Sequence, residues 1–182
     1  SNDRVRTIVQ TAAGPLPLQH YFVRDQCAPE VSGFIYEGAE SARANPEILD
    51  TLASPSLSAV IICPSNPYIS IDPMLSMPEL TQALKRCPAP IVAVSPIVGG
   101  QSLKGPTAKM MQELGAEVSA VTVARHFTDF IDGFILDPAD AKLESAVRAE
   151  GINCHMTPSV MKSLDDRVHL AKETFEFATS MR

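Results

Sequence analysis

Short apolar runs alternate with helical patterns along most of this chain. Four such runs predict buried strands, at residues 59–63, 91–94, 133–136 and 151–154. Apolar residues at helical spacing predict helices at residues 73–86, 106–114, 121–130, 139–149 and 165–180. Because strands and helices alternate, we expect an α/β fold with βαβ crossovers and a mostly parallel, Rossmann-like sheet that has helices on both faces.

The first part of the chain follows a different pattern. Three strands are expected there, at residues 5–11, 16–18 and 31–36, with a short helix at 20–24. No linker or repeat divides the sequence. We therefore expect one α/β domain over residues 1–182, with a β-rich segment at 1–40 and an α/β core at 41–182.

Two helix starts carry capping residues. Asn45 precedes Pro46, and Asp137 precedes Pro138. Asn and Asp side chains accept hydrogen bonds from the free N–H groups of a first helical turn, and proline suits that turn. We expect Asp137 to be a cap rather than an acid–base group. Met110, Met111 and the pair Phe127 and Phe130 have helical spacing and are expected in the core. The closing helix, with Val168, Phe175 and Phe177, is expected to pack on the sheet or on a partner.

Charge and composition exclude several classes of partner. The 182 residues include 21 acidic and 15 basic side chains, which give a formal net charge of −6. The basic residues are scattered, so no nucleic-acid partner is expected. No apolar run approaches the roughly 20 residues of a membrane span. With no signal-peptide core in the first residues, the expected location is cytoplasmic, without a membrane partner.

The cysteines and histidines lack the spacing of a metal or disulfide framework. The four cysteines, Cys27, Cys63, Cys87 and Cys154, include no CxxC pair, and we expect reduced, mostly buried thiols. The histidines show no HxH or HxxxH spacing. No histidine metal site is therefore expected, and no metal ligand is assigned.

The first candidate binding loop follows the predicted strand at 59–63. Ser65, Asn66 and Ser70 offer hydrogen-bond donors, and Pro67 stiffens the segment before the next helix. Hydroxyl and free N–H groups at such a point bind phosphate oxygens. The alternative is an ordinary turn between strand and helix that Asn66 and Pro67 simply close.

The second candidate loop, residues 95–106, follows the predicted strand at 91–94. It begins with Ser95, contains Gly99 and Gly100, and carries Lys104 before the next predicted helix. Loops of this length between strand and helix are often functional. The alternative is a mobile surface loop with a solvated lysine. Because both loops follow parallel strands, we expect them to meet at one edge of the sheet as a substrate-binding site. No catalytic residue is assigned.

Several strings of this sequence resemble the 2-phospho-L-lactate transferase (CofD) family of deazaflavin coenzyme biosynthesis. The longest are ICPSNP at residues 62–67 and VAVSPIVGG at 92–100. Shorter ones are DRVRT at 3–7, QHYFV at 19–23, EGA at 37–39, KGP at 104–106 and DGF at 132–134. Together they span nearly the whole chain in the order that the family has them.

The resemblance implies an enzyme. Family members transfer a phospho-lactyl, phosphoenolpyruvyl or phosphoglyceryl group from a guanosine-diphosphate-activated donor to the deazaflavin Fo, release GMP and need magnesium. The family's glycine-rich first loop, and the acidic residues that bind Fo and metal, have no counterpart here. We therefore expect the C-terminal part of such a transferase, inactive alone, with its magnesium ligands elsewhere, an open sheet edge and the possibility of a homodimer.

A second class of function stays open at this point. A nucleotide- or phosphometabolite-binding regulatory protein of related fold would use similar loops without transferring a group, and a remnant that binds no ligand is a third alternative. The residues Ser65–Asn66–Pro67, together with Val98–Gly99–Gly100, favour the transferase.

Overall fold

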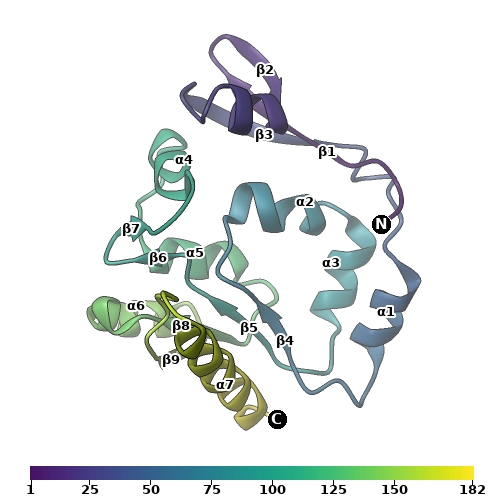
Figure 1. Ribbon diagram of the computed structural model, residues 1–182. Helices are drawn as coiled ribbons and strands as arrows, with labels where there is room; N and C mark the ends of the chain where they lie inside the picture. Colours follow the sequence, from purple (N-terminus) through teal and green to yellow (C-terminus); the bar gives the residue numbers. More distant parts are fainter.

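A four-stranded parallel sheet forms the centre of the computed structural model, which describes residues 1–182. Its strands, in spatial order, are β4 (Val60–Ile62), β5 (Ile91–Val94), β8 (Gly133–Leu136) and β9 (Asn153–Met156). All three pairings are parallel. The predicted α/β fold and its parallel sheet are confirmed (Figure 1).

Helices cover both faces of this sheet, as predicted. Helices α5 (Ala120–Phe127) and α6 (Glu144–Ala149) lie on one face, and α7 (Leu164–Ser180) lies on the other (Figure 1). Because side chains alternate along a strand, Phe134 and Leu136 of β8 pack in the α5 core while Ile135 packs against α7. All three side chains are fully buried.

Helix α1 begins at its predicted capping residue, whereas the predicted helix that follows is interrupted. In α1 (Pro46–Ala53), the Asn45 side chain accepts a hydrogen bond of 2.9 Å from the Glu47 N–H, so the predicted cap is confirmed. The single helix predicted at 73–86 is wrong. It is divided into α2 (Asp72–Leu75) and α3 (Pro78–Lys85), because the Pro78 ring disfavours a helical backbone at Met77, which is extended.

Three other boundaries differ from the sequence patterns. The helix predicted at 139–149 starts as a separate 3₁₀ turn, η3 (Pro138–Leu143), because Asp140 has non-helical backbone angles. The strand predicted at 151–154 starts two residues later, because Gly151 has φ +83° and belongs to the turn that ends α6. Helix α5 ends at Phe127 rather than at residue 130. The helix α4 (Thr107–Glu113) lies where it was expected.

A small antiparallel sheet lies above the core. Its strands are β1 (Arg6–Thr11), β2 (Gly14–Pro17) and β3 (Val31–Glu37), in the order β2-β1-β3, with the short helix η1 (His20–Arg24) packed on them. We call these elements the N-terminal unit (Figure 1). Its buried residues Val9, Tyr21 and Val31 pack with Met110 of α4, so α4 joins the unit to the core.

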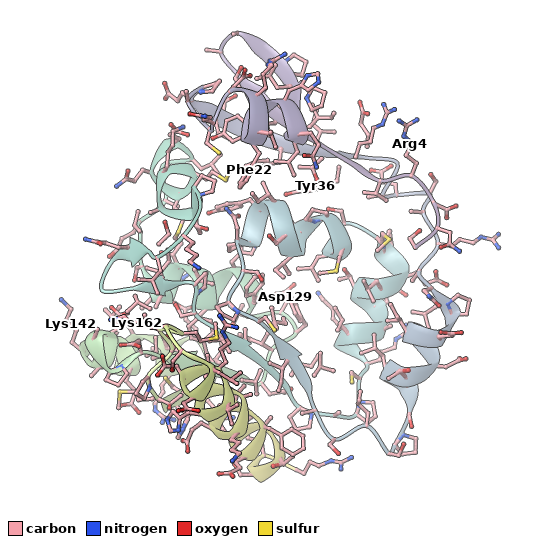
Figure 2. The ribbon with its side chains drawn as sticks, in the orientation of Figure 1. Arg4, Phe22, Tyr36, Asp129, Lys142 and Lys162 are labelled. Carbon is pink, nitrogen blue, oxygen red and sulfur yellow. The ribbon has the colours of Figure 1, made fainter.

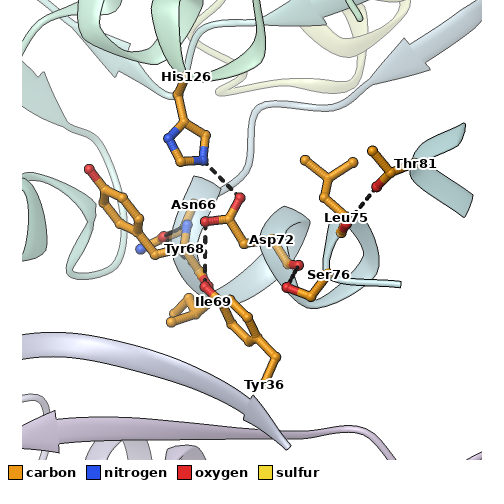
Figure 3. A network of polar contacts seen from close by, with 9 residues as sticks. All are labelled: Tyr36, Asn66, Tyr68, Ile69, Asp72, Leu75, Ser76, Thr81 and His126. Carbon is orange, nitrogen blue, oxygen red and sulfur yellow. Dashed lines mark hydrogen bonds and ion pairs between the residues drawn. The ribbon is translucent and has the colours of Figure 1, made fainter. Parts of the chain in front are cut away.

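A polar network also ties the N-terminal unit to the core (Figure 3). The Tyr36 hydroxyl on β3 donates to the Tyr68 carbonyl at 2.6 Å and lies 3.4 Å from Oδ2 of Asp72. The other oxygen of Asp72 lies 2.8 Å from Nε2 of His126 on α5. Burial, and then the nearby Asp72 carboxylate, raise the pKa of Tyr36, so its hydroxyl stays protonated and keeps donating.

Met110, Met111 and Phe127 are core residues as predicted, and Phe130 is partly buried against the same core. Helix α7 packs on the sheet through Leu170, Ala178 and the partly buried Phe177, whereas Val168 and Phe175 are exposed. The four cysteines are free, but the expectation that most are buried is wrong. Only Cys154 is buried, Cys27 and Cys87 are partly exposed, and Cys63 is exposed beside the first loop. Burial raises the pKa of the Cys154 thiol to about 11.

None of the helices combines the length with the apolar character that crossing a membrane requires.

Candidate functional site

A cavity of about 670 Å³ lies between the N-terminal unit and the carboxyl edge of the parallel sheet. The loops that follow β4, β5 and β9 form most of its wall, through residues 64–66, 69, 70, 95, 96, 98, 103–107 and 159–162. Phe22 of η1 contributes from the N-terminal unit (Figure 2). A cavity of this size suits a small-molecule ligand, and the carboxyl edge is where open parallel sheets bind ligands.

The structure brings together most of the residues singled out in the two candidate loops. Ser65, Asn66, Ser70, Ser95 and Lys104 all line this cavity. The other three do not line it. Pro67 is the buried first residue of the short helix η2 (Pro67–Ile71), and Gly99 and Gly100 lie at the exposed tip of a hairpin.

Two of the lining side chains are engaged in shaping their own loops. Oδ1 of the Asn66 side chain accepts hydrogen bonds from the N–H groups of Tyr68, at 2.9 Å, and Ile69, at 3.3 Å, and so caps η2. The buried Ser95 hydroxyl donates to the Ile97 carbonyl at 2.7 Å and accepts from the N–H of the same residue. Both side chains hold backbone in place, whereas Ser65 and Ser70 keep their hydroxyls free of bonds within the chain.

The second loop contains a hairpin that the sequence reading missed. Strands β6 (Ile97–Val98) and β7 (Gln101–Ser102) pair around Gly99 and Gly100, whose φ angles are +59° and +72°. Such a two-residue turn needs a left-handed backbone at both positions, which glycine permits. The Gly99 N–H donates to the buried Asp140 carboxylate at 2.9 Å. The Gly-Gly pair between two short runs was the available signal.

The third wall, residues 159–162, was also missed. It follows β9, which is parallel to β8, so its loop emerges at the same edge as the other two. The predicted cap is confirmed: Oδ1 of Asp137 accepts from the Ala139 N–H at 3.0 Å. Its other oxygen accepts from the Ser159 N–H at 2.8 Å and from the Ser159 hydroxyl at 3.2 Å. One carboxylate thereby fixes the ends of two neighbouring loops.

Lys162 closes this third wall at the start of α7. Ser163 caps that helix, and Oδ2 of Asp166 accepts from the N–H groups of Lys162, at 2.9 Å, and Ser163, at 2.7 Å. These backbone hydrogen bonds lower the pKa of Asp166, so its carboxylate stays charged down to acidic pH. The backbone that carries Lys162 is therefore held at both ends of the loop, by Asp137 and by Asp166.

Comparison with known proteins decides the family. The model of the family "2-phospho-L-lactate transferase CofD" matches residues 1–171. The chain belongs to this family. It is 33% identical to a phosphoenolpyruvate transferase of Kitasatospora aureofaciens, with all of this chain and 58% of the relative covered. It is 35% identical to a 2-phospho-L-lactate transferase of Methanococcoides burtonii, with 95% of this chain and 55% of the relative covered. The chain thus spans little more than half the length of these relatives.

The cavity of this CofD-family chain is positively charged in an otherwise acidic sequence. Its lining includes Lys104 and Lys162 and no aspartate, glutamate or histidine, whereas the whole chain has a formal net charge of −6. Neither lysine forms an ion pair within the chain, and Lys104 is exposed. Unpaired ammonium groups beside hydroxyls bind anions, and phosphate is an anion that lysine commonly binds.

The lining does not suit magnesium. Mg²⁺ in proteins is held chiefly by carboxylates and water. The cavity wall carries no carboxylate, and no group of three or more His, Cys, Asp or Glu side chains in the structure could hold a metal ion. We therefore assign no step of the chemistry to a metal held by these 182 residues.

Proposed function

We propose that this chain forms part of a transferase that moves a phospho-lactyl, phosphoenolpyruvyl or phosphoglyceryl group from a guanosine-diphosphate-activated donor to the deazaflavin Fo, releasing GMP. The observation that carries the proposal is the cavity of a CofD-family chain, in which two unpaired lysines are present without a single acidic side chain. Such a wall attracts a phosphorylated substrate and does not repel it.

The reaction needs charge neutralisation more than a protein nucleophile. An Fo hydroxyl oxygen forms a bond to the phosphorus that carries the acid, the bond between that phosphorus and the GMP oxygen breaks, GMP leaves with the bonding electron pair, and the hydroxyl proton passes to water. Negative charge on the phosphoryl oxygens must be stabilised as the bonds change. The cavity lining offers lysines and hydroxyls for this purpose and no side chain that would act as a general base.

Within the proposal, the candidate residues divide into two groups. Ser65, Ser70 and Lys104 bind the donor phosphates directly, since their polar groups are free and line the cavity. Asn66, Pro67, Ser95, Gly99 and Gly100 position the loops, as their hydrogen bonds and backbone angles indicate. Binding and neutralisation of the donor are therefore the part of the reaction that we give to this chain.

The donor acid and the magnesium ion are separate questions. Relatives named for phosphoenolpyruvate and for phospho-L-lactate match this chain at 33% and 35% identity, so similarity alone does not favour either acid. The magnesium ion that the family implies would take its ligands from outside these 182 residues, because the cavity has no carboxylate.

We also propose a cytoplasmic protein that forms a homodimer. The four cysteines are unpaired, as in a reducing compartment. An exposed stripe on α7 contains Leu164, Val168 and Phe175, which are spaced to lie on one helix face, and β4 is an edge strand of the sheet. Light scattering on the protein after size exclusion is expected to give a dimer mass, and Phe175→Glu is expected to give the monomer. A wild-type monomer at micromolar concentration would contradict this proposal.

The regulatory alternative is separated from the transferase by one measurement. A binding protein would hold a guanosine-diphosphate-linked donor without consuming it. The full-length protein, supplied with Fo, magnesium and each donor in turn, is expected to release GMP with one of them. Binding of a donor without GMP release would favour the regulatory function.

The role of Lys104 is tested by its removal from the full-length protein. Lys104→Ala is expected to lower kcat/KM for the donor, by an amount that corresponds to an activation free energy raised by about 1–3 kcal/mol, the contribution of a hydrogen bond to a charged group. The melting temperature is expected to stay nearly unchanged, because an exposed, unpaired lysine contributes little to folding. Lys142→Ala, which removes an exposed lysine outside the cavity, is the matched control. Unaltered donor kinetics in Lys104→Ala would remove this residue from the site.

A further inference from the structure

Two loops of the cavity wall each present an apolar side chain followed by a lysine. Leu103 and Lys104 lie on the loop after β5, and Met161 and Lys162 lie on the loop after β9. In each pair an exposed apolar side chain comes directly before an unpaired lysine. Leu103 is 54% exposed and Met161 is 39% exposed. Two loops from different strands thus bring matching chemistry to one cavity.

The apolar members of these pairs have a common neighbour in the cavity wall. Phe22 of the N-terminal unit, also largely exposed, lines the same cavity (Figure 2). Large apolar side chains left open to water beside a cavity are typical of a surface that a ligand covers. The ligand that fits this wall therefore carries an apolar group as well as an anionic one.

We propose that Met161 and Lys162 form a second ligand-binding arm, which acts with Leu103 and Lys104 to hold a phosphorylated substrate that presents an apolar face, such as an aromatic ring, beside its phosphate. The inference rests on the proposed anion-binding role of the cavity and adds the residues and the ligand class. Lys162 neutralises the phosphate together with Lys104, and Met161 covers the apolar face.

Hydrogen bonds to two carboxylates fix the backbone of the second arm. Asp137 fixes Ser159 at one end of the loop, and Asp166 accepts from the Lys162 N–H at the other end. Neither bond uses the side chain of Met161 or Lys162, so both side chains remain available to a ligand. A preorganised backbone lowers the ordering cost of binding.

The experiment uses two probes with the same anionic group, inorganic phosphate and phenyl phosphate, titrated calorimetrically into the full-length protein. Lys162→Ala is expected to weaken both probes by about fivefold or more, as loss of a charged hydrogen bond predicts. Met161→Gln is expected to weaken only phenyl phosphate. Lys162→Arg is expected to keep most of the affinity. Lys172→Ala, an exposed lysine of α7 outside the cavity, is expected to change neither affinity.

The outcomes separate this inference from the proposed function. If Lys104→Ala weakens the probes and Lys162→Ala does not, the second arm is wrong while the anion site stands. If Met161→Gln leaves phenyl phosphate binding unchanged, the apolar contact is wrong. If the unsubstituted protein binds neither probe, the anion site itself is wrong and both proposals fail. A melting temperature lowered by Lys162→Ala but not by Lys172→Ala would mark Lys162 as structural and overturn the inference.

Discussion

Replacing Phe134 with alanine is expected to lower the free energy of unfolding by about 3–5 kcal/mol, the range for large-to-small changes of a buried aromatic residue. Phe134 lies in β8, at the middle of the sheet, and its side chain is 0% exposed. It packs in the largest core cluster with Phe127 of α5 and Ala93 of β5. The cavity left by the change would lie between sheet and helix, where the backbone cannot close in.

Urea unfolding of the protein measures this loss. Phe22→Ala in η1 is the matched control, because the same atoms are removed from a side chain that is 44% exposed and lies outside the proposed dimer stripe. The control is expected to cost under about 1 kcal/mol, as most exposed substitutions do. A loss in Phe134→Ala no larger than in the control would contradict the assignment of this residue to the core.

The second large effect is expected at Asp137. Asp137→Ala removes an acceptor that three groups share: the Ala139 N–H, the Ser159 N–H and the Ser159 hydroxyl. Because the site is buried, these donors would lose their partner without full access to water. The free energy of unfolding is expected to fall by about 1.5–3 kcal/mol, the scale of a hydrogen bond to a charged group. Phosphate affinity is expected to fall as well, since the loop that carries Lys162 loses its anchor.

Thermal unfolding and phosphate titration of the same variant test both halves of this prediction. Asp165→Ala, which removes an exposed carboxylate from the first turn of α7, is the control for the change in net charge. It is expected to leave phosphate affinity within twofold of the original. Full phosphate affinity in Asp137→Ala would show that the loop after β9 does not depend on this carboxylate.

The strands of the sheet and their order along the chain were predictable, because a buried strand is visible in the sequence as a short run of apolar residues. Strands such as β5 and β8 are buried on both faces, so they read as short continuous apolar runs. The caps at Asn45 and Asp137 were also readable, because the residues that make them are adjacent in sequence. Both features depend on neighbouring residues alone.

The missed features depend on contacts between distant residues or on a single local conflict. Residues 73–86 have helical periodicity throughout, so the pattern did not reveal the break at Met77. The break arises because the Pro78 ring disfavours a helical backbone at the residue before it. No sequence pattern around Lys162 predicted its position in the cavity, because that position depends on the parallel pairing of β9 with β8. Asn66 and Ser95 line the cavity, but only the structure shows that their polar groups are bonded within the chain.

The cavity wall takes Phe22 from near one end of the chain and Lys162 from near the other. A partly folded intermediate in which either end is undocked therefore lacks a complete pocket. Substrate affinity should then report on the folding of the entire chain, because a ligand that binds only the folded state shifts the unfolding equilibrium by mass action. Variants outside the pocket lining that loosen the Tyr36–Asp72–His126 network would show their defect first at low substrate concentration, and saturating substrate would mask it.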